Sequence, residues 1–455
     1  MKKIATFVLL LILSLTIVAS SAELRINSVS SEDNWPMFNH DLSHTGFSTS
    51  TAPKTNQTLW TFTTGGAVET SPAVVDGIVY VGSDDGYVYA LNAANGSLIW
   101  KYNTYGPVQS SPAVVDGIVY IGGFHSHAVF ALNAYTGELI WSSPTNSVYP
   151  NEISSTSVAN GLVYVSVCAG TFGGEFYALN ASTGNLAWKY NPGSWLFSSP
   201  TVYCEKVYIG TSACHIVALD AISGNISWDY LVTSNGPSSH TADGTYFGYS
   251  ALLVSDGLVY FGTSKQTVQA WNASNGELVW NGNIYGSVDF STLALANGVI
   301  YASTTVGGTP GNLNFGGVTA LNARTGALLW NHTLGSVTYS SPAVADGVVF
   351  VGSDGKPSPL GVIDGKSVYA LDAATGATLW TYTTGGVVCS SPAVAYGVVY
   401  VGSNDTKVYA IGTSQNTIPS PSVPEFPSWT ILPLIVVVTL VGVTIRNKIR
   451  KNGLG

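Results

Sequence analysis

The four cysteines are the most reactive side chains of this sequence, because a thiolate can act as a nucleophile, a metal ligand or half of a disulfide. They are Cys168, Cys204, Cys214 and Cys389, and none shows the CxxC spacing of zinc sites. Cys168 and Cys214 fall in corresponding connections of adjacent sequence repeats, so a disulfide could join them in an exported chain. Cys204 and Cys214 flank opposite ends of one expected strand and should not pair.

Carboxylates and imidazoles offer acid–base or metal chemistry only where several meet. Glu69, Glu152 and Asp289 fall at the same end of three different repeats, and single acids of this kind do not build a preorganised site. His125 and His127 could place two imidazoles on one side of a hairpin arm, but no third ligand is evident. The sequence therefore predicts no metal centre and no catalytic residue.

A third set of residues is aromatic and polar, and its chemistry is binding. Aromatic faces with a few polar groups suit sugars or peptide segments. These candidate ligand-binding residues lie near the Ser-Pro pairs of the repeats: Glu69, Gln109, Trp195, Phe197, Tyr246, Phe247, Tyr249, Phe290 and Tyr339. The alternative is that the rings plug a channel or pack the loops around it.

A repeat positions these residues, and it is most regular from Ser110 to Trp141. Each repeat ends in a structural tryptophan, at spacings of 40 to 52 residues: Trp60, Trp100, Trp141, Trp188, Trp228, Trp280, Trp330 and Trp380. Short strands within such a period are typical of propeller blades. Turns such as NAANG and DAISG precede all but the first tryptophan. Their Asn or Asp and their left-handed glycine predict a turn between antiparallel strands.

Each repeat supplies four strands, which we label A to D from the middle of the ring outward. Runs such as IVYVG and YVYAL are apolar on both faces, as expected where sheets stack face to face. Strand A carries a proline in five repeats, which places it at a sheet edge that lines the channel. The last repeat lacks strand D, and residues 57–65 form a D strand with no blade before it. The sequence predicts an all-β, eight-bladed β-propeller closed by its N-terminal strand.

Residues 34–412 resemble the pyrroloquinoline-quinone (PQQ)-type propeller repeat proteins, including their lead-in, here NWPMFNHDLSHTGFS. The resemblance implies either a quinone-dependent dehydrogenase or a scaffold such as the propeller lipoprotein of outer-membrane protein assembly. Enzymes of the family hold the quinone between a tryptophan and two adjacent cysteines, beside calcium and a catalytic Asp. Because no two cysteines are adjacent here, we expect neither PQQ nor calcium, and a binding protein is favoured over an enzyme.

The two ends of the chain predict export and anchoring. Residues 1–22 read as a signal peptide, with an uncleaved anchor as the alternative, and residues 23–56 form a lead-in before the propeller at 57–412. Residues 413–428 read as a Pro/Ser-rich linker, 429–445 as a transmembrane helix and 446–455 as a basic cytoplasmic tail. Pro424-Glu425-Phe426 is similar to the PEF-type sorting signal of archaeal surface proteins. We expect a cell-surface protein on the extracellular face of the cytoplasmic membrane.

Charge and sequons fit that location. With the signal and tail set aside, 10 basic side chains remain against 25 acidic ones, a net charge of about −15 that disfavours nucleic acid. Seven N-x-[ST] sequons are glycosylation candidates: Asn56, Asn95, Asn180, Asn225, Asn272, Asn331 and Asn404.

Every long insertion falls in a D to A or a B to C connection, and strand alternation puts both kinds on one face of the disk. Variable loops on a rigid scaffold are where binding sites are usually built, although drift in unconstrained loops is the alternative. The sequence thus favours a monomeric, membrane-anchored scaffold that binds a protein or glycan partner through this face. The alternatives are a PQQ-dependent dehydrogenase, or another enzyme at the channel mouth, and a purely structural component of the cell envelope.

Overall fold

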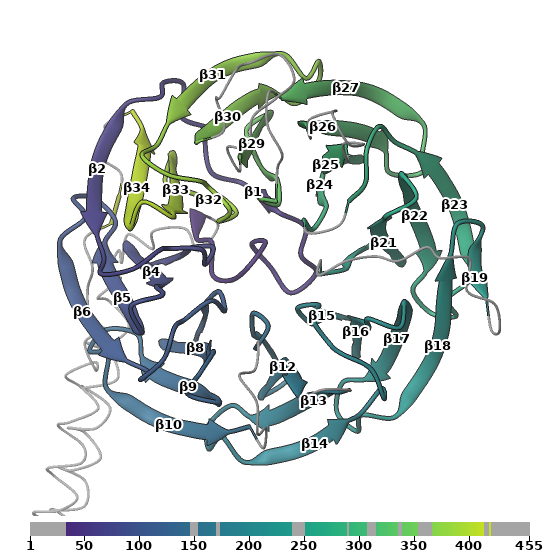
Figure 1. The fold of residues 1–455 in the computed structure, drawn as a ribbon, viewed down its shortest axis with the longest axis horizontal. Helices are drawn as coiled ribbons and strands as arrows, with labels where there is room; N and C mark the ends of the chain where they lie inside the picture. The colour runs from purple at the N-terminus through teal and green to yellow at the C-terminus, as the bar shows by residue number, and fades with distance from the viewer. Residues whose placement is uncertain are drawn as a thin grey trace, which may run out of the picture.

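The computed structural model describes residues 33–145, 153–169, 173–238, 251–288, 291–306, 315–334, 339–353, 366–413 and 418–419. These residues form eight sheets arranged as blades of a ring (Figure 1), which confirms the predicted propeller. The predicted signal peptide and the 429–445 helix lie outside the described residues. Within the described ranges, no helix has the length and apolarity to cross a membrane.

The first four blades run A, B, C, D from the channel outward. Blade 1 contains β3 (Ala73–Val75), β4 (Ile78–Gly82), β5 (Tyr87–Asn92) and β6 (Leu98–Asn103). Blade 2 contains β7 (Ala113–Val115), β8 (Ile118–Gly123), β9 (Ala128–Asn133) and β10 (Leu139–Pro144). Blade 3 contains β11 (Ser157–Ala159), β12 (Leu162–Ala169), β13 (Gly173–Asn180) and β14 (Leu186–Tyr190). Blade 4 contains β15 (Thr201–Tyr203), β16 (Lys206–Gly210), β17 (His215–Asp220), β18 (Ile226–Thr233) and an additional outer strand, β19 (Gly236–Ser238).

The other four blades complete the ring. Blade 5 contains β20 (Leu253–Ser255), β21 (Leu258–Thr263), β22 (Thr267–Asn272) and β23 (Leu278–Asn283). Blade 6 contains β24 (Ala294–Ala296), β25 (Val299–Val306), β26 (Phe315–Asn322) and β27 (Leu328–Leu334). Blade 7 contains β28 (Ala343–Ala345), β29 (Val348–Gly352), β30 (Ser367–Asp372) and β31 (Thr378–Thr383). Blade 8 joins β32 (Ala393–Ala395), β33 (Val398–Ser403) and β34 (Lys407–Gly412) to β2 (Thr58–Thr63), so the N-terminal strand closes the ring as predicted.

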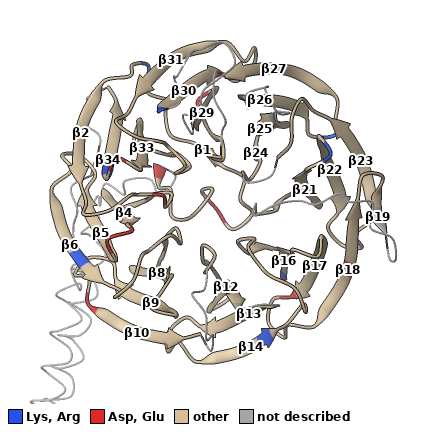
Figure 2. Ribbon diagram, in the orientation of Figure 1, with Lys and Arg blue, Asp and Glu red and all other residues tan. Residues whose placement is uncertain are grey.

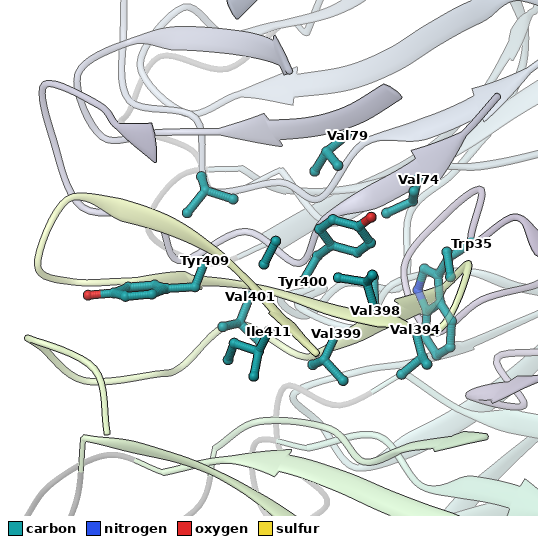
Figure 3. Close-up of a cluster of buried hydrophobic side chains, with 14 of the residues drawn as sticks. Trp35, Val74, Val79, Val394, Val398, Val399, Tyr400, Val401, Tyr409 and Ile411 are labelled. Atoms are coloured by element: carbon teal, nitrogen blue, oxygen red, sulfur yellow. The ribbon is translucent and has the colours of Figure 1, made fainter. Parts of the chain in front are cut away.

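Burial follows the position of each strand in its blade. All five residues of β4 are buried, whereas the outer strand β6 buries only Trp100. The B and C strands lie between neighbouring sheets, so both of their faces are apolar. Figure 3 shows this packing at blade 8, where Tyr400 lies on the side of β33 that faces Val79 of blade 1, whereas Val399 and Val401 point to the opposite face of the sheet. The core is therefore a ring of interfaces between blades.

The structural tryptophans join each blade to the next. Trp100 belongs to blade 1. Its indole N–H donates to the carbonyl oxygen of Ala134, in the C to D turn of blade 2, at 2.8 Å. The ring lies directly over Gly137 of that turn, which has a φ of +73°. The turn glycine thus meets two requirements at once, a left-handed backbone and space for an indole. The same indole bond recurs around the ring, from Trp60, Trp141, Trp188, Trp228, Trp280 and Trp330 to an alanine and from Trp380 to Pro53.

The lead-in runs once around the inside of the ring, a role that the sequence did not indicate. Its carbonyl groups accept hydrogen bonds from the middle residue of strand A in six blades: Val74, Val114, Val202, Val254, Leu295 and Val344, at 2.7 to 3.0 Å. At the end of this path β1 (Phe47–Ser48) pairs in parallel with β28, and the Ser50 hydroxyl accepts a hydrogen bond from Gly397 N–H. Figure 1 shows the purple lead-in inside the ring.

The lead-in occupies the end of the channel that carries the A to B turns, which we call the turn face. Asn34 accepts a hydrogen bond from the Asp76 main-chain N–H in the turn of blade 1. Trp35, only 1% exposed, packs with Val74 and Val394 between blades 1 and 8 (Figure 3). The described part of the lead-in therefore lines the inner edge of the ring at the turn face, and we call the opening at the opposite, loop-bearing face the channel mouth.

His44 of the lead-in is buried, and burial lowers its pKa to about 4, although the nearby Asp41 carboxylate acts in the opposite direction. Burial alone would raise the pKa of Asp41, but hydrogen bonds from His40 and Thr45 bring it below its usual value. Because the unfolded chain binds a proton at His44 near pH 6.5, the neutral buried imidazole stabilises the fold fully only above that pH.

We predict that acidification from pH 7 to pH 4.5 lowers the free energy of unfolding, because the unfolded chain takes up a proton at His44 that the folded chain resists. The full contribution of His44, lost as the pH falls through 4, is about 3 kcal/mol. Denaturant unfolding at a series of pH values measures it. His44→Asn is the matched control, because asparagine tolerates the φ of +56° at this position and does not titrate. Equal losses in the wild-type protein and this variant would contradict the assignment.

Candidate functional site

The insertions build up the face opposite the lead-in, as the sequence predicted. In blade 3, β12 and β13 are eight residues long each and project past the ordinary B to C turn, and β25 and β26 do the same in blade 6. In blade 4 the chain after β18 folds back as β19. The tips of the blade 3 and blade 6 insertions lie outside the described residues. We call this side of the disk the loop face.

A ring of Ser and Thr side chains surrounds the channel mouth at the loop face. The hydroxyl group of one blade accepts a hydrogen bond from the main-chain N–H of the preceding blade. Six such bonds, written from the N–H donor to the hydroxyl acceptor, measure 2.9 to 3.1 Å: Ser71 to Ser111, Ser111 to Ser155, Ala251 to Thr292, Thr292 to Ser341, Ser341 to Ser391 and Ser391 to Ser71. The ring ties the inner edges of neighbouring blades together.

The hydrogen-bond ring is interrupted over blades 3 to 5. Among the described residues, Ser155 N–H makes no hydrogen bond to the Ser199 hydroxyl group, and the position that corresponds to the next acceptor is Ala251, which has no hydroxyl group. A cavity of ≈ 210 Å³ lies over the first of these gaps. Its lining comes from blades 2 to 4: Gln109, Ser110, Phe124, Ile153, Ser154, Ser155, Leu196, Phe197 and Ser199. The interruption therefore leaves polar groups at a cavity.

The structure brings together only part of the predicted aromatic set. Trp195 and Phe197 lie in the connection before blade 4, with ring centroids 6.1 Å apart at 64°, and Phe197 lines the cavity. Tyr339 is partly buried in the corresponding connection before blade 7. Tyr246, Phe247, Tyr249 and Phe290 lie outside the described residues, as do Glu152 and Asp289. Phe124 was missed from the sequence because it precedes no Ser-Pro pair.

The predicted polar residues Glu69 and Gln109 belong to a small network beside the cavity. The Asn404 amide donates to Glu69 at 2.9 Å, and the Gln109 amide donates to Asp84 at 3.1 Å. Burial, followed by the nearby Asp84 carboxylate, raises the pKa of Glu69, although the Asn404 hydrogen bond opposes the shift. Gln109 is thereby oriented with its amide nitrogen toward Asp84, which leaves its carbonyl oxygen as an acceptor.

The predicted Cys168–Cys214 disulfide is not formed in the structure. Cys168 lies within β12, which extends past the expected connection and pairs Cys168 with Gly174, whereas Cys214 lies in the turn between β16 and β17 with its sulfur 3.8 Å from the Ser212 carbonyl oxygen. Cys204 is exposed in the A to B turn of blade 4, on the turn face. Cys389 is partly buried in the connection before β32 of blade 8.

The sequons differ in how their amide nitrogens are used. Asn56 and Asn404 donate through that nitrogen to Thr381 O and Glu69. The side-chain oxygen accepts hydrogen bonds in Asn95, Asn180, Asn272 and Asn331, whereas no such bond involves the Asn225 side chain within the described residues. Glycosylation of any of them stays a prediction.

The described residues of the mouth do not fit a quinone with its calcium ion. Within the described ranges, no group of three or more His, Cys, Asp or Glu side chains comes together. The cavity lining carries no charge, and Glu69 and Asp84 are each held by a separate amide donor. We therefore derive no step through this cofactor. Charged residues are also sparse over the described ring as a whole (Figure 2).

Comparisons with known proteins agree with the fold. Similar solved structures include quinohemoprotein alcohol dehydrogenase from Comamonas testosteroni, at 17% identity and a TM-score of 0.70, covering 88% of this chain and 83% of the other. A europium-containing methanol dehydrogenase shares 16% identity at a TM-score of 0.68, covering 85% and 99%. BamB from Moraxella catarrhalis shares 18% at 0.60, covering 79% and 98%. No curated protein matches the chain in sequence.

A family model provides the sequence relationship that these distant structures do not. The model described as outer membrane protein assembly factor BamB matches residues 49–165, 125–310 and 314–417, which together span nearly the whole propeller. The matched ranges contain the blade tryptophans, the turn glycines beneath them and the strands of all eight blades. The chain therefore belongs to the PQQ-type propeller repeat family that this model describes.

Proposed function

We propose that this protein is a cell-surface scaffold, tethered through residues 429–445, that binds a protein or glycan partner through its loop face. The observation that carries the proposal is the asymmetry of the disk. The long connections, the aromatic pair Trp195–Phe197 and the cavity all lie on one face, while the lead-in binds the inner strands at the other. Fixed strands that present variable loops are the usual architecture of a binding surface.

The position of residues 418–419, which precede the predicted membrane segment, supports an outward orientation of the loop face. Ile418 packs against the core between blades 1 and 8, and a Cβ added at Gly77 would lie 2.1 Å from the Pro419 carbonyl oxygen. Gly77 belongs to an A to B turn, so residues 418–419 leave from the turn face. A membrane segment that follows them would hold the turn face toward the bilayer and present the loop face outward.

Affinity purification of the intact protein from its own membranes tests the proposal. We expect a surface partner whose recovery falls at least tenfold when Trp195, which is 40% exposed on the loop face, is replaced by alanine. Ile222→Ala is the matched control, because Ile222 is 60% exposed on the turn face of the same blade. A chain that ends at residue 419 should appear in the soluble fraction. Equal loss with both substitutions, or retention with both, contradicts binding through the loop face.

A further inference from the structure

We infer that the cavity over blades 2 to 4 binds one neutral, hydroxyl-rich ring, a hexose unit. The inference rests on the proposed function, since it names a ligand class for the same face. It is carried by the interrupted hydrogen-bond ring, by the aromatic wall and by the absence of charge among the nine lining residues.

Two serines supply the polar groups. Ser154 and Ser110 are engaged within the protein, because their hydroxyl groups accept from Ser166 N–H at 3.0 Å and from Gly122 N–H at 3.1 Å. Ser155 accepts from Ser111 N–H but donates to no group in the described part of the chain. The hydroxyl and N–H groups of Ser199, a residue only 8% exposed, make no hydrogen bond to any described residue. Both serines line the cavity, so a ligand bound there can hydrogen-bond to their hydroxyl groups.

The rest of the lining favours a sugar ring. Phe124 and Phe197 provide aromatic surface and Leu196 and Ile153 an aliphatic floor, which suit the C–H face of a pyranose. The carbonyl oxygen of Gln109 adds an acceptor at the rim, because its amide nitrogen is held by Asp84. A volume of ≈ 210 Å³ is below the range of drug-sized sites, so it fits one ring and not a larger cofactor.

Charge and backbone geometry disfavour the competing ligands. A phosphate or carboxylate would be buried against a lining with no cation to offset its charge. An extended peptide would need a sheet edge to pair with, but the inner-edge strands are three residues long and the lead-in bonds the middle residue in six of them. A neutral polyol uses the separate donors and acceptors that remain.

Titration of the intact protein with methyl glycosides of glucose, galactose, mannose and N-acetylglucosamine, followed by Trp fluorescence and NMR, tests the inference. We expect saturable binding of at least one of them and none of glucuronic acid. Phe197→Ala should weaken binding at least tenfold and Ser199→Ala about fivefold. The hexose could be the end of a glycan chain or a free sugar, and a glycopeptide that ends in the preferred sugar separates these two sources. Tighter binding of the glycopeptide than of the free sugar identifies a glycan chain end, and equal binding identifies a free sugar.

Ser391→Ala is the matched control, because the Ser391 hydroxyl accepts the Ser341 N–H in the intact part of the ring at 2.9 Å. It should lower the Tm and leave sugar affinity unchanged, whereas Ser199→Ala should lower affinity and leave the Tm unchanged. No saturable binding of any neutral glycoside, displacement of the sugar by an unglycosylated peptide, or affinity unchanged by Phe197→Ala overturns the inference. Partner capture that depends on Trp195 would survive that failure, so the proposed function is judged separately.

Discussion

Removal of residues 33–50, with β2 retained, is expected to abolish cooperative folding of the ring. The lead-in accepts hydrogen bonds from strand A of six blades and buries Trp35, Met37, Asn39 and His44 inside the channel. Six main-chain bonds at about 1 kcal/mol each, together with about 2 kcal/mol or more for the buried Trp35, reach the total stability of an ordinary domain. Removal of the lead-in leaves the main-chain N–H groups of these six strands without their protein acceptors.

Circular dichroism during heating measures this effect, since the intact protein should unfold in one sharp step and the shortened protein should show none. Addition of residues 33–50 as a separate peptide should restore the step, because the peptide carries both the main-chain acceptors and the buried Trp35 and His44 side chains in their native order. The same peptide with its residues in scrambled order is the control. A shortened protein with an unchanged Tm would show that the blades hold the ring without the lead-in.

The lead-in also marks what the sequence could not predict. Because the blades repeat in sequence, each tryptophan with its turn glycine supports the assignment of the others. Counting these repeats predicts eight blades, the last of which is closed by the N-terminal strand. The lead-in has no period, because each of its residues meets a different blade. Trp35 contacts Val74, only 39 positions away, whereas Ser50 reaches Gly397 across 347 positions. No local sequence pattern therefore predicts the path of the lead-in.

The candidate site was predictable in the same uneven way. Gln109 and Phe197 were found because they lie two residues before a Ser-Pro pair, and both line the cavity. Ser155 and Ser199 look like the other serines of the ring in sequence, so their missing hydrogen bond depends on how the blades are spaced. Ala251 was the one readable signal, because a hydroxyl group is replaced there by a methyl group.

The spacing between blades can itself be tested at Gly137. Gly137→Ala is expected to destabilise the protein by about 4 kcal/mol, because a Cβ there would lie 2.6 Å from Trp100 Cδ2 as well as adopt a φ of +73°. The indole must move, and its 2.8 Å hydrogen bond to Ala134 O is then lost. Denaturant unfolding measures the change, since about 4 kcal/mol is a large share of the stability of a single domain.

Gly161→Ala isolates the backbone contribution to this loss. Gly161 has a φ of +72°, but nothing lies within 4 Å of an added Cβ, so only about 1–2 kcal/mol of conformational strain is expected. The excess at Gly137 is then the steric contact between two blades. In a Trp100→Leu background that excess should disappear, and Gly137→Ala should cost no more than Gly161→Ala. If the two glycine substitutions already cost the same in the wild-type protein, the tryptophans only fill space at the rim and do not set the distance between blades.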